Sequence, residues 1–421
     1  MLNKISFYIS VFIIIFFIST ILAFEKSKIS VATYNGAKGT YVLIKNFFNE
    51  TKNLVDSNSQ SLFKSKLINF EKFYFASVFG FKNKINLFDD EGNKIHSWNI
   101  SNFNFADTVV PFSFIIKKNK DMILNTDTVW DGLDESYIAK IDKNSKIIWK
   151  KKVPTHHWIS LHKNKIYSPI RYFKKFPDDL PESVNKLDLK FCDSNILQHK
   201  LSWYENILIL DENNGEIIGE IDLLNKISKE KELYGLIENC ENPLHFNDVV
   251  PVTKELENES INLHEGDLIV SLNSPNLIVI LDVKDNYDIK YFYFNSFKKQ
   301  HAPRLTSRGT IIVYDNQGGH NYYKYGYSRI IEIDVKTGNL LGFFDGSDEI
   351  FFDSNARGYI DYIEDGIYLI TSPLDFRVFV INCKKNNNLL SNKCDSEVLL
   401  ESKKGTEMNI MTKVYDGNFF N

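Results

Sequence analysis

Short apolar stretches separated by polar turns fill the chain after residue 60, and no long stretch has an apolar period of 3.6 residues. Such stretches predict β-strands, with few helices. One short helix is expected over residues 223–237, where the apolar positions fit an amphipathic helix. High aromatic content, 14% of the chain, agrees with strands, because aromatic side chains fit a pleated, half-buried surface.

One local pattern recurs: an apolar strand ending in Asp or Asn, a polar turn, and a second apolar strand. The Asp or Asn is found at Asp89, Asp142, Asp211, Asp282, Asp334 and Asn382, at intervals of 48 to 71 residues. In this position the side chain accepts backbone N–H groups where the turn begins. Repeats near 50 residues built from four short strands are typical of β-propellers, so six repeats predict an all-β, six-bladed propeller. A pair of stacked β-sandwiches is the alternative.

The repeats divide the chain into three parts. Residues 61–421 are expected to form the propeller, and residues 25–60 a linker that leads into its first blade. Two intervals are longer than the others, and residues 174–202, rich in Asp, Lys and Pro, are the expected insertion.

Residues 5–24 contain no charged side chain, and 20 apolar residues in a helix span a bilayer core of about 30 Å. Residues 1–24 are therefore expected to be a signal anchor, which holds the protein on the membrane facing the periplasm. A cleaved signal peptide, with release into the periplasm, is the alternative. In an oxidising compartment a Cys383–Cys394 disulfide is plausible, although four cysteines allow three pairings and unpaired thiols remain an alternative.

Charge and motifs exclude several classes of function. Fifty Lys and Arg face 54 Asp and Glu, for a net charge of −4 without a basic stripe, so no nucleic-acid partner is expected. The phosphate-binding motif G-x-x-x-x-G-K-[ST], the serine-hydrolase motif G-x-S-x-G and the zinc motif H-E-x-x-H are all absent from the sequence. Nucleotide-dependent transfer and serine-hydrolase chemistry therefore lose most of their support.

Unusual polar residues follow the repeated turns, where the chain must return to the propeller axis to begin the next blade. They are His156 and His157, then His245, Asn247 and Asp248, then Gln300, His301 and Arg304, and finally Arg357. Only nine histidines occur in the chain, yet three successive repeats place one at this point. We therefore expect these histidines to converge near the axis.

At these residues the sequence resembles the bacterial arylsulfotransferase family, whose members are six-bladed propellers of the cell envelope. The matching stretches are KIDKNSKIIW, THHWISL, LHFND, GDLIVSLNSPNLIVILD, QHAPRLTSRGTIIVYDNQGG and SRIIEID, and they cover most of residues 87–370. The QH and HxND stretches are moderately specific, whereas the Asp turns are common to many propellers.

The resemblance implies transfer of a sulfuryl group from a phenolic sulfate ester to a phenol, without a nucleotide donor or another cofactor. His301 matches the family's nucleophile, which is transiently sulfurylated. His245 and Asn247 match the pair that holds the sulfuryl oxygens, and His157, or its neighbour His156, matches the remaining active-site histidine. No resident metal is implied.

One position departs from the family pattern: Asn273 stands where family members usually carry an Arg, and an amide lacks the charge of a guanidinium. Arg304 or Arg357 is the candidate to supply that charge. The departure keeps a noncatalytic binding or scaffold propeller open as an alternative function. A metal-dependent hydrolase, with Asp248 and Asp107 completing a histidine site, is the third.

Overall fold

The computed structural model describes residues 67, 73–79, 84–89, 93–100, 109–128, 136–175, 201–237, 242–318, 328–347, 350, 352–375, 377–401 and 409–416. All of these belong to one compact unit, Gln60–Asn421. The expected signal anchor and linker lie outside the described residues. Within the described ranges, no helix has the length and apolar character needed to cross a membrane.

The described strands form six antiparallel sheets of four strands each. The first sheet has the order β24 (Asn409–Asp416), β1 (Phe73–Phe79), β2 (Lys84–Phe88) and β3 (Lys94–Asn99). The second contains β4 (Val109–Ile116), β5 (Met122–Thr128), β6 (Tyr137–Ile141) and β7 (Ile147–Lys152). The third contains β8 (Ser160–His162), β9 (Lys165–Lys175), β10 (Leu201–Asp211) and β11 (Ile217–Asp222).

The remaining three sheets follow in chain order. The fourth contains β12 (Phe246–Pro251), β13 (Leu268–Leu272), β14 (Leu277–Asp282) and β15 (Asp288–Tyr293). The fifth contains β16 (His301–Leu305), β17 (Thr310–Asp315), β18 (Arg329–Asp334) and β19 (Leu340–Phe344). The sixth contains β20 (Tyr359–Glu364), β21 (Ile367–Ser372), β22 (Arg377–Asn382) and β23 (Asp395–Glu401). Short 3₁₀ turns lie at η3 (Lys254–Leu256), η4 (Glu259–Ile261), η5 (Val283–Asp285), η6 (Pro373–Asp375) and η7 (Lys384–Asn386).

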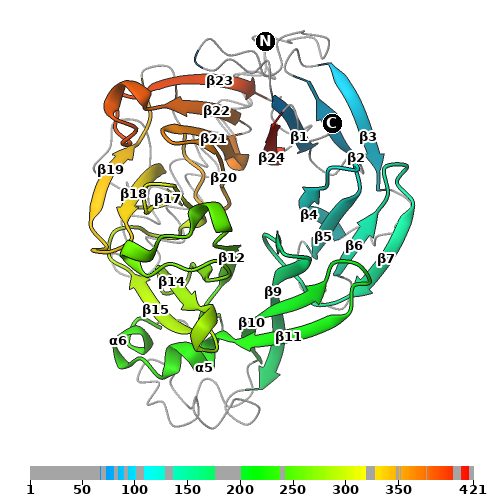
Figure 1. The fold of residues 1–421 in the computed structure, drawn as a ribbon, viewed down its shortest axis with the longest axis horizontal. Helices are drawn as coiled ribbons and strands as arrows, with labels where there is room; N and C mark the ends of the chain where they lie inside the picture. Colours follow the sequence, from blue (N-terminus) through cyan, green and yellow to red (C-terminus); the bar gives the residue numbers. More distant parts are fainter. Residues whose placement is uncertain are drawn as a thin grey trace, which may run out of the picture. The chain divides into compact units, whose positions relative to one another are not determined.

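The sheets follow one another around a common centre, with one edge strand of each sheet inside and the other outside (Figure 1). We call β4, β8, β12, β16, β20 and β24 the inner strands. Strand β12 contacts β8 and β16, β16 contacts β20, β20 contacts β24, and β24 contacts β4. Strand β24 also pairs with β1, so the two ends of the ring share one sheet. This arrangement is an all-β propeller and not a pair of stacked sandwiches.

The repeated Asp or Asn has the predicted place and role. All six lie at the end of the third strand of a sheet or directly after it, where the turn to the outermost strand begins. Each side-chain oxygen accepts a backbone N–H of its own turn, at 2.7 to 3.0 Å, and the six acceptors are Asp89, Asp142, Asp211, Asp282, Asp334 and Asn382. The turn prediction is therefore confirmed for every repeat.

The middle strands differ from the half-buried strands that the sequence pattern suggested. Strands β13, β17 and β21 are buried along their entire length, whereas the outer strands β7 and β11 are largely exposed. A middle strand is covered on both faces by neighbouring sheets, so residues on both of its faces are buried and most of them are apolar. The cores accordingly lie between consecutive sheets: one joins the second and third, another the third and fourth, and a third the fourth and fifth.

The expected helix is present in altered form. Two short helices, α5 (Leu223–Ser228) and α6 (Lys231–Tyr234), replace a single helix, because Glu230 between them is extended. The side chain of Asp222 caps α5 by accepting the backbone N–H of Asn225. The ends of the expected insertion are not loop, since Lys174 and Lys175 pair with Ser202 and Leu201 in the β9–β10 hairpin. The residues between them lie outside the described part.

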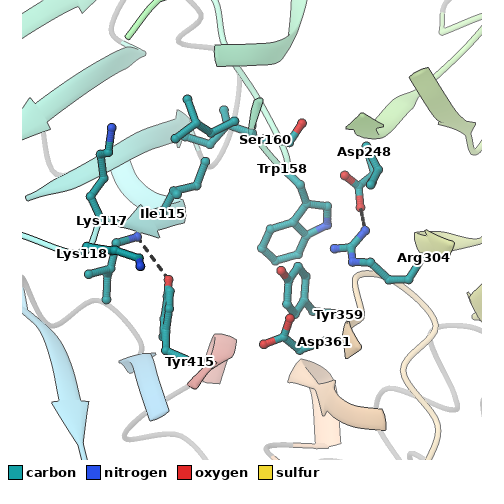
Figure 2. A pocket seen from close by; sticks show the side chains of 14 residues that line it. Ile115, Lys117, Lys118, Trp158, Ser160, Asp248, Arg304, Tyr359, Asp361 and Tyr415 are labelled. Carbon is teal, nitrogen blue, oxygen red and sulfur yellow. Dashed lines mark hydrogen bonds and ion pairs between the residues drawn. The ribbon is translucent and has the colours of Figure 1, made fainter. Parts of the chain in front are cut away.

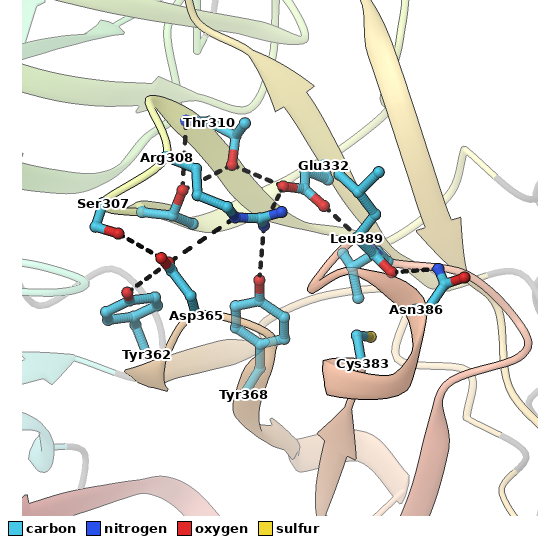
Figure 3. A network of polar contacts seen from close by, with 12 residues as sticks. Ser307, Arg308, Thr310, Glu332, Tyr362, Asp365, Tyr368, Cys383, Asn386 and Leu389 are labelled. Atoms are coloured by element: carbon cyan, nitrogen blue, oxygen red, sulfur yellow. Dashed lines mark hydrogen bonds and ion pairs between the residues drawn. The ribbon is translucent and has the colours of Figure 1, made fainter.

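A disulfide links two residues of the sixth sheet's outer turn, and hydrogen bonds join the same turn to the fifth sheet. The expected disulfide is confirmed, as Cys383 and Cys394 are bonded with their Cα atoms 4.5 Å apart. Nearby, the buried Glu332 of β18 accepts hydrogen bonds from Arg308 at 2.5 Å and from the hydroxyl of Thr310 at 2.7 Å (Figure 3). Its second oxygen accepts the backbone N–H of Leu390 at 3.1 Å, which joins the fifth sheet to the sixth.

Replacing Glu332 with alanine is expected to lower the free energy of unfolding by about 3 kcal/mol, because it leaves a partly buried guanidinium and a buried N–H without their acceptor. Urea unfolding followed by tryptophan fluorescence measures the loss. The matched control is Glu216→Ala, at an exposed turn position, which should change stability by less than about 0.5 kcal/mol. Equal stability of the two variants would contradict the role given to Glu332.

Candidate active site

The functional residues that the sequence singled out lie where inner strands begin. His157 lies shortly before β8, His245 directly before β12, His301 opens β16, and Arg357 precedes β20. Each sheet has four antiparallel strands, so the chain leaves the outer strand at the end where it entered the inner one. All inner strands therefore begin at the same end of the propeller, which explains why residues far apart in sequence meet there.

The four histidines His156, His157, His245 and His301 form one group, which we call the histidine cluster. The ring centroid of His157 lies 4.8 Å from that of His156, 5.4 Å from that of His245 and 6.2 Å from that of His301. Phe112 of β4 packs against His157 with a centroid distance of 5.3 Å. The convergence expected from the sequence register is therefore present, with His157 at its centre.

One ring nitrogen of His301, Nδ1, is hydrogen-bonded within the protein. Its Nδ1 lies 2.7 Å from the side-chain oxygen of Asn316, whose amide nitrogen donates to the backbone carbonyls of Ser354 and Arg357. These carbonyls fix the orientation of the amide, so His301 Nδ1 carries the proton and Nε2 carries the lone pair. Burial lowers the pKa of His301 to about 4, which keeps the imidazole neutral at pH 7. A neutral, oriented imidazole with a free Nε2 is a competent nucleophile.

Behind His157 lies a chain of titratable groups that ends at a carboxyl group. The Nδ1 atoms of His156 and His157 are 2.6 Å apart, and Nε2 of His156 is 3.4 Å from Oε1 of Glu205. Glu205, on β10, is buried, and its Oε2 accepts the backbone N–H of Phe246 at 2.9 Å. Burial raises the pKa of Glu205 to about 7 and lowers the pKa values of both histidines well below their usual value.

His245 has a different setting. Its Nδ1 lies 2.7 Å from the side-chain nitrogen of Asn242, and burial lowers its pKa to about 3. Asn273, at the position where the sequence resemblance expects an Arg, donates its backbone N–H to the carbonyl of His245 at 3.0 Å. Asn273 therefore lies next to a cluster histidine.

Three cations surround the histidine cluster. After burial, their charges lower the histidine pKa values further: Arg171 acts on His156, His157 and His245, Lys299 acts on His245 and His301, and Arg357 acts on His301. Arg171 belongs to β9 and lies with its guanidinium 4.0 Å from the ring centroid of Trp203. The positive field favours an anionic ligand.

Backbone geometry at the cluster is unusual. His157, His245, Lys299, Ala302 and Arg357 all have φ between +46° and +64°, the left-handed region that residues other than glycine rarely adopt. The pairing register also shifts between Phe246 and Asp248 and between His301 and Arg304. Bulges and strained residues of this kind often reorient side chains beside active sites.

Three predicted site residues have contacts that differ from those expected. Arg304 does not reach the histidine cluster with a free guanidinium, because it pairs with Asp248 at 2.8 Å and donates to the carbonyl of Ile360. The side-chain nitrogen of Asn247 donates to the carbonyl of Gln300 at 2.7 Å, so this amide holds the backbone just before His301. Because Asp248 pairs with Arg304, its carboxylate is not available to complete a metal site. Across the described ranges, no three His, Cys, Asp or Glu side chains are grouped to hold a metal ion, and Asp107 lies outside those ranges.

Sequence reasoning missed Arg171, Glu205 and Asn316. A signal existed for one of them: the second strand of each sheet ends beside the start of the inner strand, and Asn316 directly follows the end of β17. Arg171 lies inside β9, where it pairs with Glu205 in the ladder. Glu205 lies in the third sheet's long hairpin, and nothing in its local sequence separates it from a surface glutamate.

No protein-family model and no curated protein matches the chain. Several solved structures are similar, each at low identity. A protein of unknown function from Bacteroides caccae is 9% identical over 82% of this chain and 98% of its own, with a TM-score of 0.45. A streptogramin B lyase is 13% identical over 84% and 100%, with a TM-score of 0.44, and AztD from Citrobacter koseri is 10% identical over 83% and 99%, with a TM-score of 0.41. These likenesses extend no further than the fold, so the resemblance to arylsulfotransferases rests on the sequence motifs alone.

Proposed function

We propose that the protein is an envelope enzyme that moves a sulfuryl group from a phenolic sulfate ester to a phenol, through a sulfo-histidine at His301. In this proposal each of the six sheets is one blade, and residues 1–24 hold the propeller at the membrane, facing the periplasm. The disulfide between Cys383 and Cys394 supports an oxidising compartment. The observation that carries the proposal is the neutral His301 oriented by Asn316 beside two further histidines.

In the first step, the lone pair on Nε2 of His301 attacks sulfur, and the bond between sulfur and the phenolic oxygen breaks. The phenolate leaves with that electron pair, and the His301 ring becomes a sulfated imidazolium. Asn316 accepts the Nδ1–H of this cationic ring and therefore stabilises it. Arg171, Lys299 and Arg357 supply the positive field for the charge that spreads over the sulfuryl oxygens in the transition state.

The proton for the leaving phenolate comes from Glu205 in this scheme. Its Oε2 already accepts a backbone N–H, so a protonated Glu205 carries its proton on Oε1, which faces His156. Nε2 of His156 lies 3.4 Å from Glu205 and has no hydrogen bond in the described structure, so it takes that proton when the two groups approach. His156 then gives its Nδ1 proton to Nδ1 of His157, and His157 gives its Nε2 proton to the phenolate. In the second step an acceptor phenol attacks sulfur, its proton returns along the same chain, and the bond between nitrogen and sulfur breaks.

The test is a transfer assay with 4-nitrophenyl sulfate as donor and phenol as acceptor, without any nucleotide. Two half-reactions through a covalent intermediate predict parallel lines in double-reciprocal plots, the ping-pong pattern, and formation of phenyl sulfate. Failure to form phenyl sulfate at millimolar concentrations of both substrates would reject the proposal and favour a noncatalytic propeller.

A further inference from the structure

Most of the large apolar side chains that are exposed in the described residues share one position in the repeat. Eight of these nine side chains lie five to seven positions after the turn Asp or Asn, at or shortly before the start of the outermost strand. The eight are Ile95, Ile147, Ile148, Ile217, Ile218, Leu340, Leu341 and Leu389. In the fourth sheet the equivalent Ile289 is partly buried against the core that includes α5. Single exposed aliphatic side chains are ordinary, whereas neighbouring pairs indicate a contact surface.

Two of the isoleucine pairs are neighbours on the rim of the propeller. Ile147–Ile148 and Ile217–Ile218 begin β7 and β11, the outer strands of successive sheets (Figure 1), and these side chains are 36% to 51% exposed. Trp149 joins the two pairs. Its indole nitrogen donates to the backbone carbonyl of Glu212 at 3.0 Å, and its ring packs against Gly215 in the turn before β11. The four isoleucines therefore belong to one surface.

The second sheet has a large excess of positive charge. Its described residues 109–128 and 136–152 contain nine lysines and three aspartates, whereas the whole chain has a net charge of −4. The third sheet, residues 160–175 and 201–222, has five basic and six acidic residues, of which Glu216 is exposed beside the isoleucines of β11. The two sheets together keep an excess of five positive charges, which the mild net charge of the chain conceals.

This positive charge is concentrated on the rim. Lys117 and Lys118 line a central cavity of about 530 Å³ (Figure 2), and Lys117 and Lys140 bind the buried Glu212. Five of the remaining lysines lie on β7 or in the turn before it, and they are Lys143, Lys146, Lys150, Lys151 and Lys152. The exposed Lys143 and Lys146, together with the four isoleucines, form a surface that we call the rim patch.

A second apolar group on the rim lacks this charge. It consists of Leu340–Leu341 of β19 and Leu389, and it lies where Gly342 packs against the outer turn of the sixth sheet. In the described residues of these two sheets, from 301 to 344 and from 359 to 401, eight basic residues face ten acidic ones. We call this the leucine group, and it is the natural comparison for the rim patch.

We propose that the rim patch docks on an anionic phospholipid surface, with its isoleucines at the boundary between headgroups and acyl chains and its lysines at the lipid phosphates. Exposed apolar side chains next to lysines are the combination that holds proteins to such surfaces. A nucleic acid fits less well, because its apolar contacts are made by stacking on aromatic rings and not by isoleucine.

The docking does not depend on sulfuryl transfer. In the proposed function residues 1–24 hold the propeller at a membrane, and the rim patch then determines which edge of the propeller faces the lipid. Because the rim patch lies on outer strands, it leaves uncovered the end of the propeller where the inner strands and the histidine cluster begin.

Hydrogen–deuterium exchange of the full-length protein tests this with vesicles of phosphatidylcholine alone and with vesicles of equal parts phosphatidylcholine and phosphatidylglycerol. Within the described sheet β7 pairs with β6 alone, so its outward N–H groups exchange fast unless something covers them. Residues 143–152 and 214–220 should exchange at least about fivefold more slowly with the anionic vesicles, and high salt should remove the difference. Attachment through residues 1–24 is the same in both vesicles, so the difference reports on the rim patch.

Two double variants at exposed positions separate the contributions of charge and apolar surface. Lys143→Glu with Lys146→Glu should abolish the slowing by anionic vesicles, because it reverses the charge that the lipid attracts. Ile148→Ser with Ile218→Ser should reduce the slowing at least about threefold.

The matched control makes the same kinds of change in the leucine group. Lys336→Glu with Leu341→Ser, at exposed positions of the fifth sheet, should leave the slowing at β7 and β11 unchanged. His301→Ala separates the docking from the proposed function, because it should remove sulfuryl transfer and keep the slowing. Lys143→Glu with Lys146→Glu should do the reverse.

Equal exchange of β7 and β11 with the two kinds of vesicle would overturn the proposal. Slow exchange of residues 143–152 before any vesicle is added would overturn it too, since another segment of the chain or a second copy would then cover the rim patch. A slowing that survives Lys143→Glu with Lys146→Glu, or that the leucine-group control removes, would also contradict it.

Discussion

Replacing His301 with alanine is expected to lower kcat/KM for 4-nitrophenyl sulfate by at least about 10³-fold, because the variant has no atom that can take the sulfuryl group. We do not expect His157 or His245 to replace it as the nucleophile. The ring centroid of His157 lies 5.4 Å from that of His245 and 6.2 Å from that of His301, so neither ring occupies the position of His301. His301 is also the ring that Asn316 orients. Steady-state release of 4-nitrophenol measures the change.

The matched control for this variant is His162→Ala. His162 lies on β8, outside the histidine cluster, where its Nε2 is 3.4 Å from Glu265. This control should retain activity within about threefold, which corresponds to well under 1 kcal/mol. If His301→Ala released phenol at the rate of His162→Ala, His301 would not be the nucleophile.

Replacing Glu205 with glutamine is expected to lower kcat/KM on the order of 10²-fold for phenyl sulfate and only slightly for 4-nitrophenyl sulfate. Phenolate is a poor leaving group because phenols like that of tyrosine have a pKa of about 10, so it depends on a proton donor. The nitro group stabilises the phenolate and removes most of that dependence. The expected signature is therefore a difference between two substrates in one variant.

Under the proposed function, Glu205 and His301 should set the pH dependence of transfer by the wild-type protein. Glu205, with its pKa raised to about 7, holds its proton below that pH and loses it above, so the rate with phenyl sulfate should fall as the pH rises through 7. His301, with its pKa lowered to about 4, loses its lone pair to a proton only below that pH. The profile should thus be bell-shaped, and Glu205→Gln should abolish its alkaline limb.

Glu216→Gln, at an exposed turn position, is the control for this experiment and should leave both substrates and the profile unchanged. A Glu205→Gln enzyme with equal losses on both substrates, or with its alkaline limb intact, would show that Glu205 has only a structural role.

Sequence pattern predicted the parts of this fold that depend on local chemistry. The Asp and Asn turns were predictable because each side chain bonds to its own turn, within a few residues, as Asp142 does with Asn144. The meeting of His157, His245 and His301 was predictable because the four-stranded repeat returns each inner strand to the same end. The disulfide was one plausible pairing among several, and the structure shows it.

Features that depend on contacts between sheets were not predictable from one sequence. The β24–β1 pairing joins segments more than 300 residues apart, and no local pattern marks it. Burial in the third sheet beside the fourth raises the pKa of Glu205, although the backbone N–H that Phe246 donates to it acts in the opposite direction. Arg304 seemed able to supply the missing guanidinium, but Asp248, three residues beyond His245, pairs with it.

At the histidine cluster too, the sequence around Asn273 does not reveal which charges other sheets contribute. The identity of Asn273 suggested that the site lacks a guanidinium, because register places it where the resemblance expects Arg. The neighbouring sheet supplies Arg171, whose charge acts on three of the four cluster histidines. A positive charge that is absent at Asn273 in the fourth sheet is thus present at Arg171 in the third, which only the three-dimensional arrangement reveals.

The most direct test of sulfuryl transfer through His301 is peptide mass spectrometry after rapid mixing with 4-nitrophenyl sulfate and an alkaline quench. The account predicts a sulfuryl group on the peptide that contains His301, its disappearance when phenol is added as acceptor, and its absence in His301→Ala. Release of 4-nitrophenol without any such adduct, or an adduct on a different residue, would contradict it.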